Sequence, residues 1–469
     1  MRDLVSTFRQ VANTQGDATA LIAGAAHISF ADLAARAGGF AQHLHARGIR
    51  PGARVLVAMP VGIDLFVALA GAWAAGLSVV FPEPAMGLRG LRHAVSTTKP
   101  EAFLASGSYT WIKPIVPGLW RCKTLAPRGT MAPLPDAPDP SSTALISFTS
   151  GSTGRPKAIA RSHAFLMAQH SAVAPLLAGA GVDLVAFPVF TLVNLAAGRT
   201  SVLPGWRLSR PEQVTPADLT RCIGASGATR ALLPPSLCET LVESGDLGPL
   251  HTVFTGGGPV KPQLVAALRD RGLRVVSVYG STEAEPIAEL DWADATDTDI
   301  ALMQNGGGLL AGHPVPGLSL RLKDDEIQVA GAHVNEGYLD PADDRTTKLR
   351  DPESGATWHR TGDAGRLDDQ GRLWLLGRSA AVRAEGDQKL YPFAVELAAE
   401  AWPGVRQAAL ADHAGRAVLV IAGDLAALPD WRGRAKGMGI DTVRHVQSIP
   451  MDRRHRSKVD YAALLAMLK

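Results

Sequence analysis

The chain has 469 residues, of which 46% are hydrophobic and 19% are charged, and this composition excludes a chain that is disordered throughout. The formal net charge of +3 is too small to indicate, by itself, binding to nucleic acid or to an anionic membrane. The three cysteines are widely spaced and odd in number, which excludes a disulfide framework and a cysteine-based zinc site.

Short apolar runs alternate with helix-length amphipathic segments along most of the chain. The segment 262–270 shows the helical pattern. The runs that predict buried strands are 54–59, 183–187, 231–233, 253–255 and 275–278. Alternation of this kind predicts an α/β fold, with a large N-terminal domain of stacked, mostly parallel sheets covered by helices.

The most membrane-like stretch runs from Leu65 to Phe81. It is shorter than the roughly 20 residues that a membrane span needs, and glycines interrupt it. We therefore expect a buried helix that leads into a buried strand. The first residues, Met1-Arg2-Asp3-Leu4-Val5, lack the apolar core of a signal peptide, so we expect a cytoplasmic protein without a membrane span.

The last ninety or so residues have the pattern of a separate small α+β unit. It contains an apolar strand at 417–422 and a final helix at 461–468. We place the boundary after Gly377, so that residues 1–377 form the large domain and residues 378–469 the small one.

A strand enters a loop rich in hydroxyls and glycines in the segment Leu145-Ile-Ser-Phe-Thr-Ser-Gly-Ser-Thr-Gly-Arg-Pro-Lys157. Glycines let the backbone approach phosphate oxygens, while amides, hydroxyls and a lysine bind the anion. The alternative is a flexible turn. The segment is not a Walker loop, because Lys157 stands three residues after Gly154. It resembles the signature loop of the adenylate-forming superfamily of acyl-CoA synthetases, peptide-synthetase adenylation domains and luciferases. The resemblance implies a nucleotide-binding role for Thr149, Ser150, Gly151, Ser152, Thr153, Gly154 and Lys157.

A second segment, Val276-Ser-Val-Tyr-Gly-Ser-Thr-Glu283, resembles the next nucleotide motif of that superfamily. The resemblance implies that Tyr279 stacks on adenine, that Thr282 contacts the α-phosphate and that Glu283 holds Mg²⁺. A flat apolar ring suits a purine and a carboxylate oxygen suits Mg²⁺. Upstream, Thr255-Gly-Gly-Gly-Pro259 is similar to the turn that packs against adenine, which implicates Gly257 and Gly258; by itself it is an ordinary glycine turn.

Two further segments follow in the order of the superfamily. Trp358-His-Arg-Thr-Gly-Asp363 resembles the ribose motif, in which the aspartate accepts both ribose hydroxyls. Leu375-Leu-Gly-Arg378 resembles the end of the large domain, where the arginine contacts the nucleotide. A lone Thr-Gly-Asp would be a turn, and its position before Arg378 favours the ribose role.

Near the C-terminus, the segment Ile449-Pro-Met-Asp-Arg-Arg-His-Arg-Ser-Lys458 is similar to the one that carries the superfamily's catalytic lysine. A cation there stabilises the charge that shifts between carboxylate and α-phosphate. The alternative is a solvated basic run. The resemblance implies that Lys458 is catalytic together with Thr282 and Glu283, and that residues 378–469 are a mobile lid.

Two departures narrow the resemblance. Ala380 stands where many members have a hinge aspartate. Thr191 follows Phe190 at a position where many acyl-CoA ligases have a histidine in the wall of the acyl pocket. The resemblance therefore places Phe190 and Thr191 in the expected acyl pocket. The tail motif and the segment Lys389-Leu-Tyr-Pro392 are instead similar to the β-lactone synthetases of bacterial olefin and lactone pathways.

These resemblances imply ATP- and Mg²⁺-dependent activation of a carboxylic acid, such as a fatty or 3-hydroxy acid, to an acyl-AMP with release of pyrophosphate. Closure to a β-lactone with release of AMP would follow. The alternatives are transfer of the acyl group to CoA or to a carrier-protein thiol, and a non-catalytic protein that binds an acyl group or a nucleotide. No nucleic-acid partner is expected.

Overall fold

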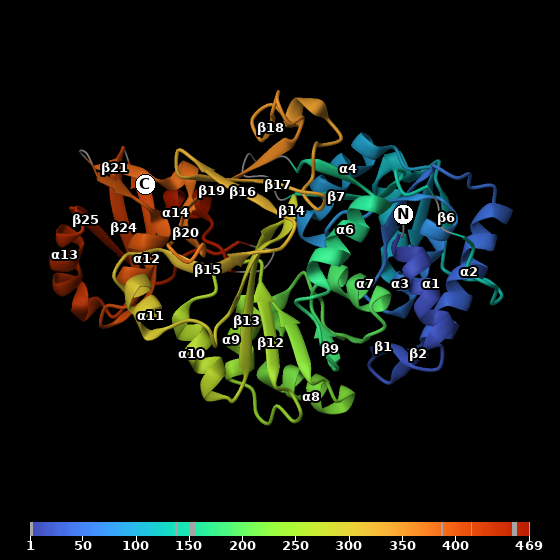
Figure 1. The fold of residues 1–469 in the computed structure, drawn as a ribbon, viewed down its shortest axis with the longest axis horizontal. Coiled ribbons are helices and arrows are strands. Elements are labelled where there is room, and N and C mark those ends of the chain that lie inside the picture. Colours follow the sequence, from blue (N-terminus) through green and yellow to red (C-terminus); the bar gives the residue numbers. More distant parts are fainter. Residues whose placement is uncertain are drawn as a thin grey trace.

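The structure is a computed structural model that describes residues 3–136, 139–149, 156–385, 388–413, 415–452 and 457–468. Along its long axis the N-terminal part lies at one end and the C-terminal part at the other, with a central sheet between them (Figure 1).

Six strands form a sheet in the N-terminal part of the described chain, in the order β6-β5-β3-β4-β7-β8. Neighbours are parallel except the last pair, which is antiparallel. The strands are β3 (Arg54–Ala58), β4 (Ser78–Val80), β5 (Ala102–Ala105), β6 (Lys123–Leu125), β7 (Thr143–Phe148) and β8 (Ala158–Ser162).

A second sheet of fourteen strands, counted over the described residues, runs through the middle of the molecule. Its order is β16-β17-β19-β20-β15-β14-β13-β12-β11-β9-β10-β1-β2, and β18 pairs with β19. The strands of its parallel part, with the short hairpin β1–β2 at the edge, are β1 (Thr19–Ala23), β2 (Ala26–Ser29), β9 (Val182–Val185), β10 (Thr200–Leu203), β11 (Arg230–Leu233), β12 (Thr252–Gly256) and β13 (Arg274–Ser281). The strands of its antiparallel part are β14 (Ala284–Asp291), β15 (Leu309–Pro314), β16 (Ser319–Lys323), β17 (Glu326–Ala330), β18 (Lys348–Arg350), β19 (Thr357–Leu367) and β20 (Leu373–Arg378).

Helices cover these sheets, and polar caps fix where several of them begin. The Thr215 side chain accepts from the Asp218 backbone N–H at the start of α8, and Thr296 does the same for α11 through Asp299. The helices are α1 (Leu4–Thr14), α2 (Phe30–Ala46), α3 (Ile63–Ala74), α4 (Gly87–Thr98), α5 (Ile112–Ile115), α6 (His163–Val173), α7 (Pro188–Ala196), α8 (Pro216–Ser226), α9 (Pro235–Val242), α10 (Pro262–Asp270) and α11 (Asp297–Gln304).

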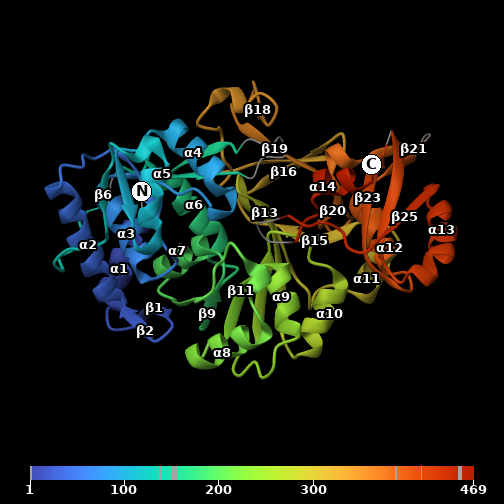
Figure 2. The same ribbon diagram turned by 180° about the vertical axis from the view of Figure 1, so that it is seen from behind.

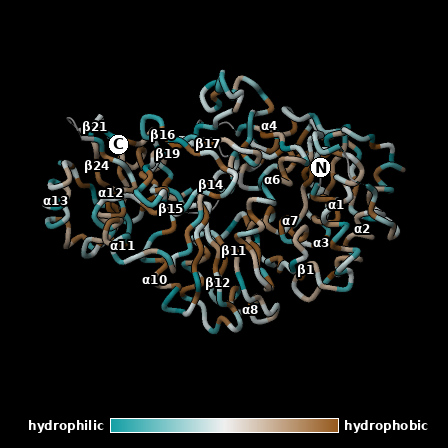
Figure 3. Tube along the Cα trace, viewed as in Figure 1, coloured by the Kyte–Doolittle hydropathy of each residue, from teal (hydrophilic) through white to brown (hydrophobic). Residues whose placement is uncertain are grey.

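The strands of the parallel part of the central sheet are largely hydrophobic, as expected for strands buried on both faces. All four residues of β11 are buried, and Figure 3 shows hydrophobic colour along β11 and β12. Four clusters of buried apolar side chains hold the first 380 or so of the described residues together, and the largest two lie on the N-terminal and the central side of the molecule.

The C-terminal residues build a sheet of three strands with an apolar cluster on each face. Its strands are β23 (Val405–His413), β24 (Arg416–Gly423) and β25 (Thr442–Val446). Side chains alternate between the faces, so Leu410 packs in the cluster of Trp431 and Ala409 in the cluster of Leu464. The other elements here are the hairpin β21 (Arg383–Glu385) and β22 (Gln388–Leu390), and the helices α12 (Pro392–Glu400), α13 (Leu428–Gly437) and α14 (Tyr461–Met467).

The predicted α/β fold class is confirmed, and each apolar run singled out above forms a strand, β3, β9, β11, β12 or β13. The segment 65–81 forms most of α3 and then β4, both buried, as expected. The antiparallel half from β14 to β20 was not anticipated. Within the described residues, none of the helices has both the length and the apolar character that a membrane span requires.

Candidate functional site

The motifs singled out in the sequence meet at the carboxyl ends of parallel strands, where α/β proteins usually bind ligands. β12 ends at Gly256 and leads directly into Gly257 and Gly258, while its neighbour β13 carries Tyr279 near its end. Gly256 pairs with Val278 across the two strands, so the glycine loop and the Tyr279 segment lie side by side.

The base of the hydroxyl- and glycine-rich loop lies at the carboxyl end of β7. The backbone N–H of Thr149 donates to the carbonyl oxygen of Lys157 over 3.0 Å and closes the base of the loop. Lys157 Nζ donates to the carbonyl oxygen of Asp343 over 3.3 Å and lies 4.8 Å from the centre of the Tyr338 ring. The predicted loop residues Ser150, Gly151, Ser152, Thr153 and Gly154 lie outside the described residues.

Two contacts bring this loop base, which belongs to the N-terminal sheet, up to the turn that contains Thr282 and Glu283 in the central sheet. The guanidinium of Arg161 donates to the carbonyl oxygen of Thr282. The backbone N–H of Leu339 donates to the carbonyl oxygen of Ala158 over 2.8 Å. The two sheets therefore meet at Lys157, Thr282 and Glu283.

Glu283 is the centre of a buried polar cluster. The Tyr338 hydroxyl donates to Glu283 Oε1 over 2.8 Å, and the Asn335 backbone N–H donates to the Glu283 carbonyl oxygen over 2.7 Å. Burial acts to raise the pKa of the Glu283 carboxyl, but His359, the Tyr338 hydroxyl and Lys348 together lower that pKa below its ordinary value. Glu283 is therefore held as a carboxylate.

The two basic side chains of this cluster have lowered pKa values. Burial lowers the pKa of Lys348 to about 8, although Glu283 opposes the shift. Burial and Lys348 lower the pKa of His359 to about 4, so His359 is neutral near pH 7. At that pH Lys348 is the cation that neutralises Glu283. Lys348 also lies 5.4 Å from the centre of the Tyr338 ring, which it shares with Lys157.

Tyr279, Asp363 and Arg378 form a second cluster. The Tyr279 hydroxyl donates to Asp363 Oδ2 over 2.8 Å, and Arg378 Nη1 lies 3.3 Å from Asp363 Oδ1. Arg378 also donates to the carbonyl oxygen of Thr361 over 3.1 Å. Burial and the Asp363 charge raise the pKa of Tyr279, which keeps the phenol protonated as a donor. A carboxylate has about four acceptor positions, so Asp363 keeps capacity for further donors.

Lys458 is exposed and lies on a turn that Asp452 fixes. The backbone N–H groups of Ser457 and Lys458 both donate to Asp452 Oδ1, over 3.0 and 2.9 Å. The Asp452 N–H donates in turn to the Lys458 carbonyl oxygen over 2.7 Å. A Cβ added to Gly258 would come within 2.3 Å of Ser457 Cβ, so the glycine loop after β12 lies directly against the Lys458 turn.

Phe190 and Thr191 lie on α7, beyond the carboxyl end of β9. Phe190 packs edge-on against Phe187, with ring centroids 5.9 Å apart, beside an apolar cluster that includes Leu232 and Phe254. Thr191 is fully buried, and its hydroxyl has no hydrogen-bond partner among the described residues.

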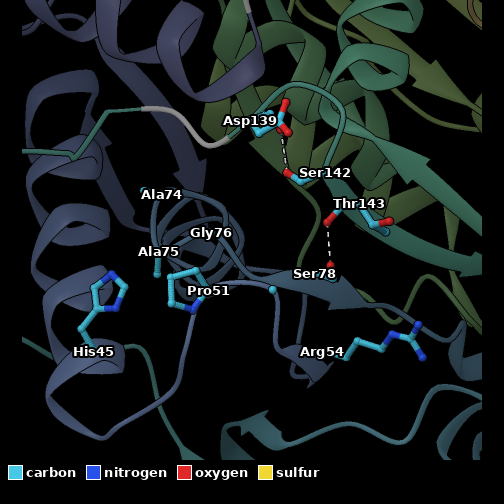
Figure 4. A pocket seen from close by; sticks show the side chains of 11 residues that line it. His45, Pro51, Arg54, Ala74, Ala75, Gly76, Ser78, Asp139, Ser142 and Thr143 are labelled. Carbon is cyan, nitrogen blue, oxygen red and sulfur yellow. Dashed lines mark hydrogen bonds between the residues drawn. The ribbon is translucent and has the colours of Figure 1, made fainter.

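A surface depression of about 590 Å³ lies away from the candidate site residues described above (Figure 4). Its lining includes Arg54, Ser78 and Thr143, which are the first residues of β3, β4 and β7. Because β7 begins at this depression and ends next to Thr149, the depression and the phosphate-loop base lie at opposite ends of the same strand.

Sequence reasoning did not identify four residues that the structure places around the predicted ones: Tyr338, Lys348, His359 and Asp452. His359 and Asp452 lie inside the motifs quoted above, but only their neighbours were given a role. No motif marked Tyr338 or Lys348. Lys348 is the first residue of the short strand β18, and a lysine there gives no sign of burial until its partner strand is known.

Comparisons with known proteins agree with this arrangement. A family model described as "AMP-binding enzyme" matches residues 8–339. The chain is 29% identical over 431 residues to an olefin β-lactone synthetase of Stenotrophomonas maltophilia, covering 82% of this chain and 78% of that protein. It is 27% identical over 419 residues to a feruloyl-CoA synthase of Amycolatopsis, covering 84% and 82%. The crystal structure of ATP-bound MatB from Rhodopseudomonas palustris superposes with a TM-score of 0.83 at 21% identity, over 100% of this chain and 99% of that one.

Proposed function

Because the chain belongs to the AMP-binding enzyme family, it is an adenylate-forming ligase, and we propose that it uses ATP and Mg²⁺ to activate a carboxylic acid as an acyl-AMP. One observation carries the proposal. Lys157, at the base of the hydroxyl- and glycine-rich loop, lies over the ring of Tyr338, and the carboxylate of Glu283 accepts from the hydroxyl of the same residue. A cation for phosphates and an oxygen ligand for a metal ion are thus held together at the meeting point of two sheets.

The residues present fit a hydrated magnesium ion. Mg²⁺ is usually held by one or two carboxylates and phosphate oxygens while it keeps several waters. Glu283 supplies a charged carboxylate. In the described part of the chain, the buried Asn335 Oδ1 and His359 Nδ1 have no hydrogen-bond partner, and both residues belong to the Glu283 cluster. Such acceptors would receive hydrogen bonds from metal-bound waters. The ion, when bound, neutralises phosphate charge and orients the phosphates.

The nucleotide would extend from this metal side to the Tyr279–Asp363–Arg378 cluster. Asp363 has acceptor capacity left for the two ribose hydroxyls, and the Tyr279 ring offers a flat face for adenine. Thr282 would contact the α-phosphate between the two clusters, and the loop from Thr149 to Lys157 would bind the β- and γ-phosphates. A carboxylate oxygen then attacks the α-phosphorus, the bond from the α-phosphorus to the bridging oxygen breaks, and pyrophosphate leaves.

Residues 1–377 and 378–469 would act as two domains, with Lys458 supplied by the smaller one. Asp452 fixes the backbone of the Lys458 turn through two backbone N–H groups, and Gly258 leaves room for that turn against the glycine loop. In this arrangement Lys458 is a mobile cation that stabilises charge on the carboxylate and the α-phosphate. Closure of the smaller domain would exclude water from the acyl-AMP.

The second step would be closure of a β-lactone. The similarity to olefin β-lactone synthetases supports it, as do Ala380 and Thr191 at positions where many CoA ligases differ. The 3-hydroxyl oxygen of the acid attacks the acyl carbon, the bond from that carbon to the AMP oxygen breaks, and AMP leaves with the hydroxyl proton released to solvent. A tethered nucleophile reaches effective molarities of about 10⁵ M or more, which offsets part of the ring strain. The similarity to feruloyl-CoA synthase supports the alternative, transfer to CoA.

Mass spectrometry of the products separates these outcomes. The full chain is incubated with ATP and Mg²⁺ and either a 3-hydroxy acid or the matching acid without the hydroxyl, each with and without CoA. We expect the 3-hydroxy acid to yield lactone, AMP and pyrophosphate without CoA, and the other acid to stop as bound acyl-AMP. If CoA accelerated AMP release and both acids gave a thioester, the enzyme would be a CoA ligase and lactone closure would be ruled out. Orthophosphate in place of pyrophosphate would overturn adenylation itself.

Lys458→Ala tests the role of the C-terminal turn. We expect acyl-AMP formation to fall by about 10²-fold or more, the effect of losing a charge contact in the transition state, while ATP still binds. Lys436→Ala, on α13, is the matched control because Lys436 is an exposed lysine of the same C-terminal part. Pyrophosphate release within a few-fold of the unsubstituted enzyme would remove Lys458 from the mechanism.

A further inference from the structure

An exposed patch with aromatic, aliphatic and basic side chains lies in the N-terminal part, on α4 and on the segment 107–120. We call it the basic aromatic patch, and its members are Leu88, Arg89, Arg92, Trp111, Ile115 and Trp120. Trp111 is 75% exposed and Trp120 62%, and they are the two exposed tryptophans among the described residues. Large apolar side chains with this exposure usually mark an interaction surface when they are grouped.

The members of the basic aromatic patch come from two segments that contact each other. They lie on α4 and on the segment that runs from η2 (Gly107–Trp111) through α5 and η3 (Pro117–Leu119) to Trp120. Arg92 donates to the carbonyl oxygen of Ile115 over 3.2 Å and joins α4 to α5. The Trp120 indole N–H donates to the carbonyl oxygen of Pro114 over 3.3 Å and folds Trp120 back onto α5. Figure 2 shows α4 and α5 beside each other.

α4 has two distinct faces, and its inner face is already occupied. Ala94 and Val95 pack into an apolar cluster beneath the sheet, and His93 contacts the carbonyl oxygen of Pro156 over 3.0 Å. The outer face carries Leu88, which is 40% exposed, and the two arginines. The exposed outer face of α4 is therefore not the face that packs against the sheet.

The segment of the chain that carries the patch has a one-sided charge. Residues 84–128 contain seven lysines and arginines, which are Arg89, Arg92, Lys99, Lys113, Arg121, Lys123 and Arg128, and one acidic residue, Glu101. The net charge of this segment is therefore 7 − 1 = +6, although the whole chain carries only +3. None of these seven cations forms a salt bridge with an aspartate or glutamate in the part of the chain that the structure describes.

We infer that the basic aromatic patch docks this protein reversibly onto an anionic phospholipid surface. Tryptophans and aliphatic side chains enter the interface between headgroups and acyl chains, while lysines and arginines are attracted to anionic headgroups. The exposed aliphatic residues Leu88 and Ile115 favour lipid over nucleic acid, because they cannot stack on bases. The proposal does not depend on the fate of the acyl-AMP.

Co-sedimentation of the full chain with vesicles tests the proposal. The vesicles contain phosphatidylcholine alone or an equimolar mixture with phosphatidylglycerol. We expect binding to the mixed vesicles that weakens with added salt, and little binding to phosphatidylcholine. The double variant Trp111→Ser/Trp120→Ser should lower the partition coefficient at least about tenfold. Arg89→Gln/Arg92→Gln should lower it and reduce the salt dependence.

Matched controls place the same changes elsewhere. Leu425→Ser/Met467→Ser removes two exposed apolar side chains, and Arg432→Gln/Lys436→Gln removes two exposed cations, all in the C-terminal part. Both controls should bind like the unsubstituted chain, and all four double variants should keep pyrophosphate release. Equal binding by patch and control variants would overturn the proposal. The proposal would also be overturned if the chain did not bind vesicles. In that case self-association, or binding to single-stranded DNA, that Trp111→Ser/Trp120→Ser abolishes would assign the patch to a different partner.

Discussion

Two glutamates, in two regions of the molecule, have pKa values shifted in opposite directions. Glu283 lies where the two large sheets meet, and Glu396 lies on α12 in the C-terminal part. Burial raises the pKa of Glu396 to about 7, while the pKa of Glu283 is lowered although burial opposes that shift. Glu396 accepts from the Tyr461 hydroxyl and the Leu410 N–H, both over 2.9 Å, and these donors are neutral. Glu283 accepts from a tyrosine too, but it also faces Lys348 and His359.

The difference separates a functional carboxylate from a structural one. Neutral donors reduce the desolvation cost of a buried carboxylate only in part, whereas a cation can reverse the pKa shift. Lys348 and Glu283 stabilise one another's charges at a place with unpartnered acceptors, which suits a site that receives phosphates and a metal ion. Glu396 joins α12 to β23 and α14 and needs no charge for that role.

The largest effect is expected from matched substitutions of the two glutamates. Glu283→Gln should lower acyl-AMP formation by about 10²- to 10³-fold, because an amide is a weaker ligand for Mg²⁺ and carries no charge. Glu396→Gln should leave acyl-AMP formation within a few-fold of that of the unsubstituted enzyme. Pyrophosphate release at saturating ATP and Mg²⁺ measures both. Similar losses in the two variants would contradict the division into functional and structural carboxylates.

The next effect concerns stability and pH. The folded-state pKa of Glu396 is raised from 4.5 to about 7, so the stability that this group contributes is fully present below pH 4.5 and is lost as pH rises through about 7. The difference between the pKa of Glu396 in the folded and in the unfolded chain corresponds to about 3 kcal/mol in the free energy of unfolding. Glu396→Gln should remove this dependence.

Denaturant unfolding of the full chain at about pH 5 and about pH 8 measures the change. From the lower to the higher pH, the free energy of unfolding should fall further for the unsubstituted chain than for Glu396→Gln. The difference between the two decreases should be most of the about 3 kcal/mol. Glu353→Gln, at an exposed glutamate, is the control and should follow the unsubstituted chain. Parallel pH curves for all three proteins would mean that Glu396 is ionised in the folded state at low pH.

The smallest effect concerns Lys348. Its lowered pKa of about 8 means that its charge is present below that pH and is lost above it. If this charge helps to bind the triphosphate, kcat/KM for ATP should fall about tenfold per pH unit above pH 8, because that parameter reports the free enzyme. Lys348→Arg should keep the charge and flatten this limb. An identical pH profile for Lys436→Arg and Lys348→Arg would remove Lys348 from ATP binding.

The sequence predicted local structure best where the chain's own pattern decides it. The helix predicted at 262–270 is observed as α10 with the same bounds, because an apolar face and a proline at its first position specify it locally. The glycines after β12 and the hydroxyls after β7 follow apolar strands, so their place at strand ends was predictable. The antiparallel half from β14 to β20 was missed, since single strands do not show which neighbour they will pair with.

By itself, therefore, the sequence determined the strands, the loops that follow them and the types of residue on those loops. Only the tertiary structure decided which of these residues meet. Tyr338, Lys348 and His359 reach Glu283 because β18 pairs with β19 and the 335–339 segment crosses beside the β13–β14 turn. The pKa values of the two glutamates depend on burial and on charges from segments distant in the chain. Desolvation and Coulomb interactions act through space, and residue order alone does not contain them.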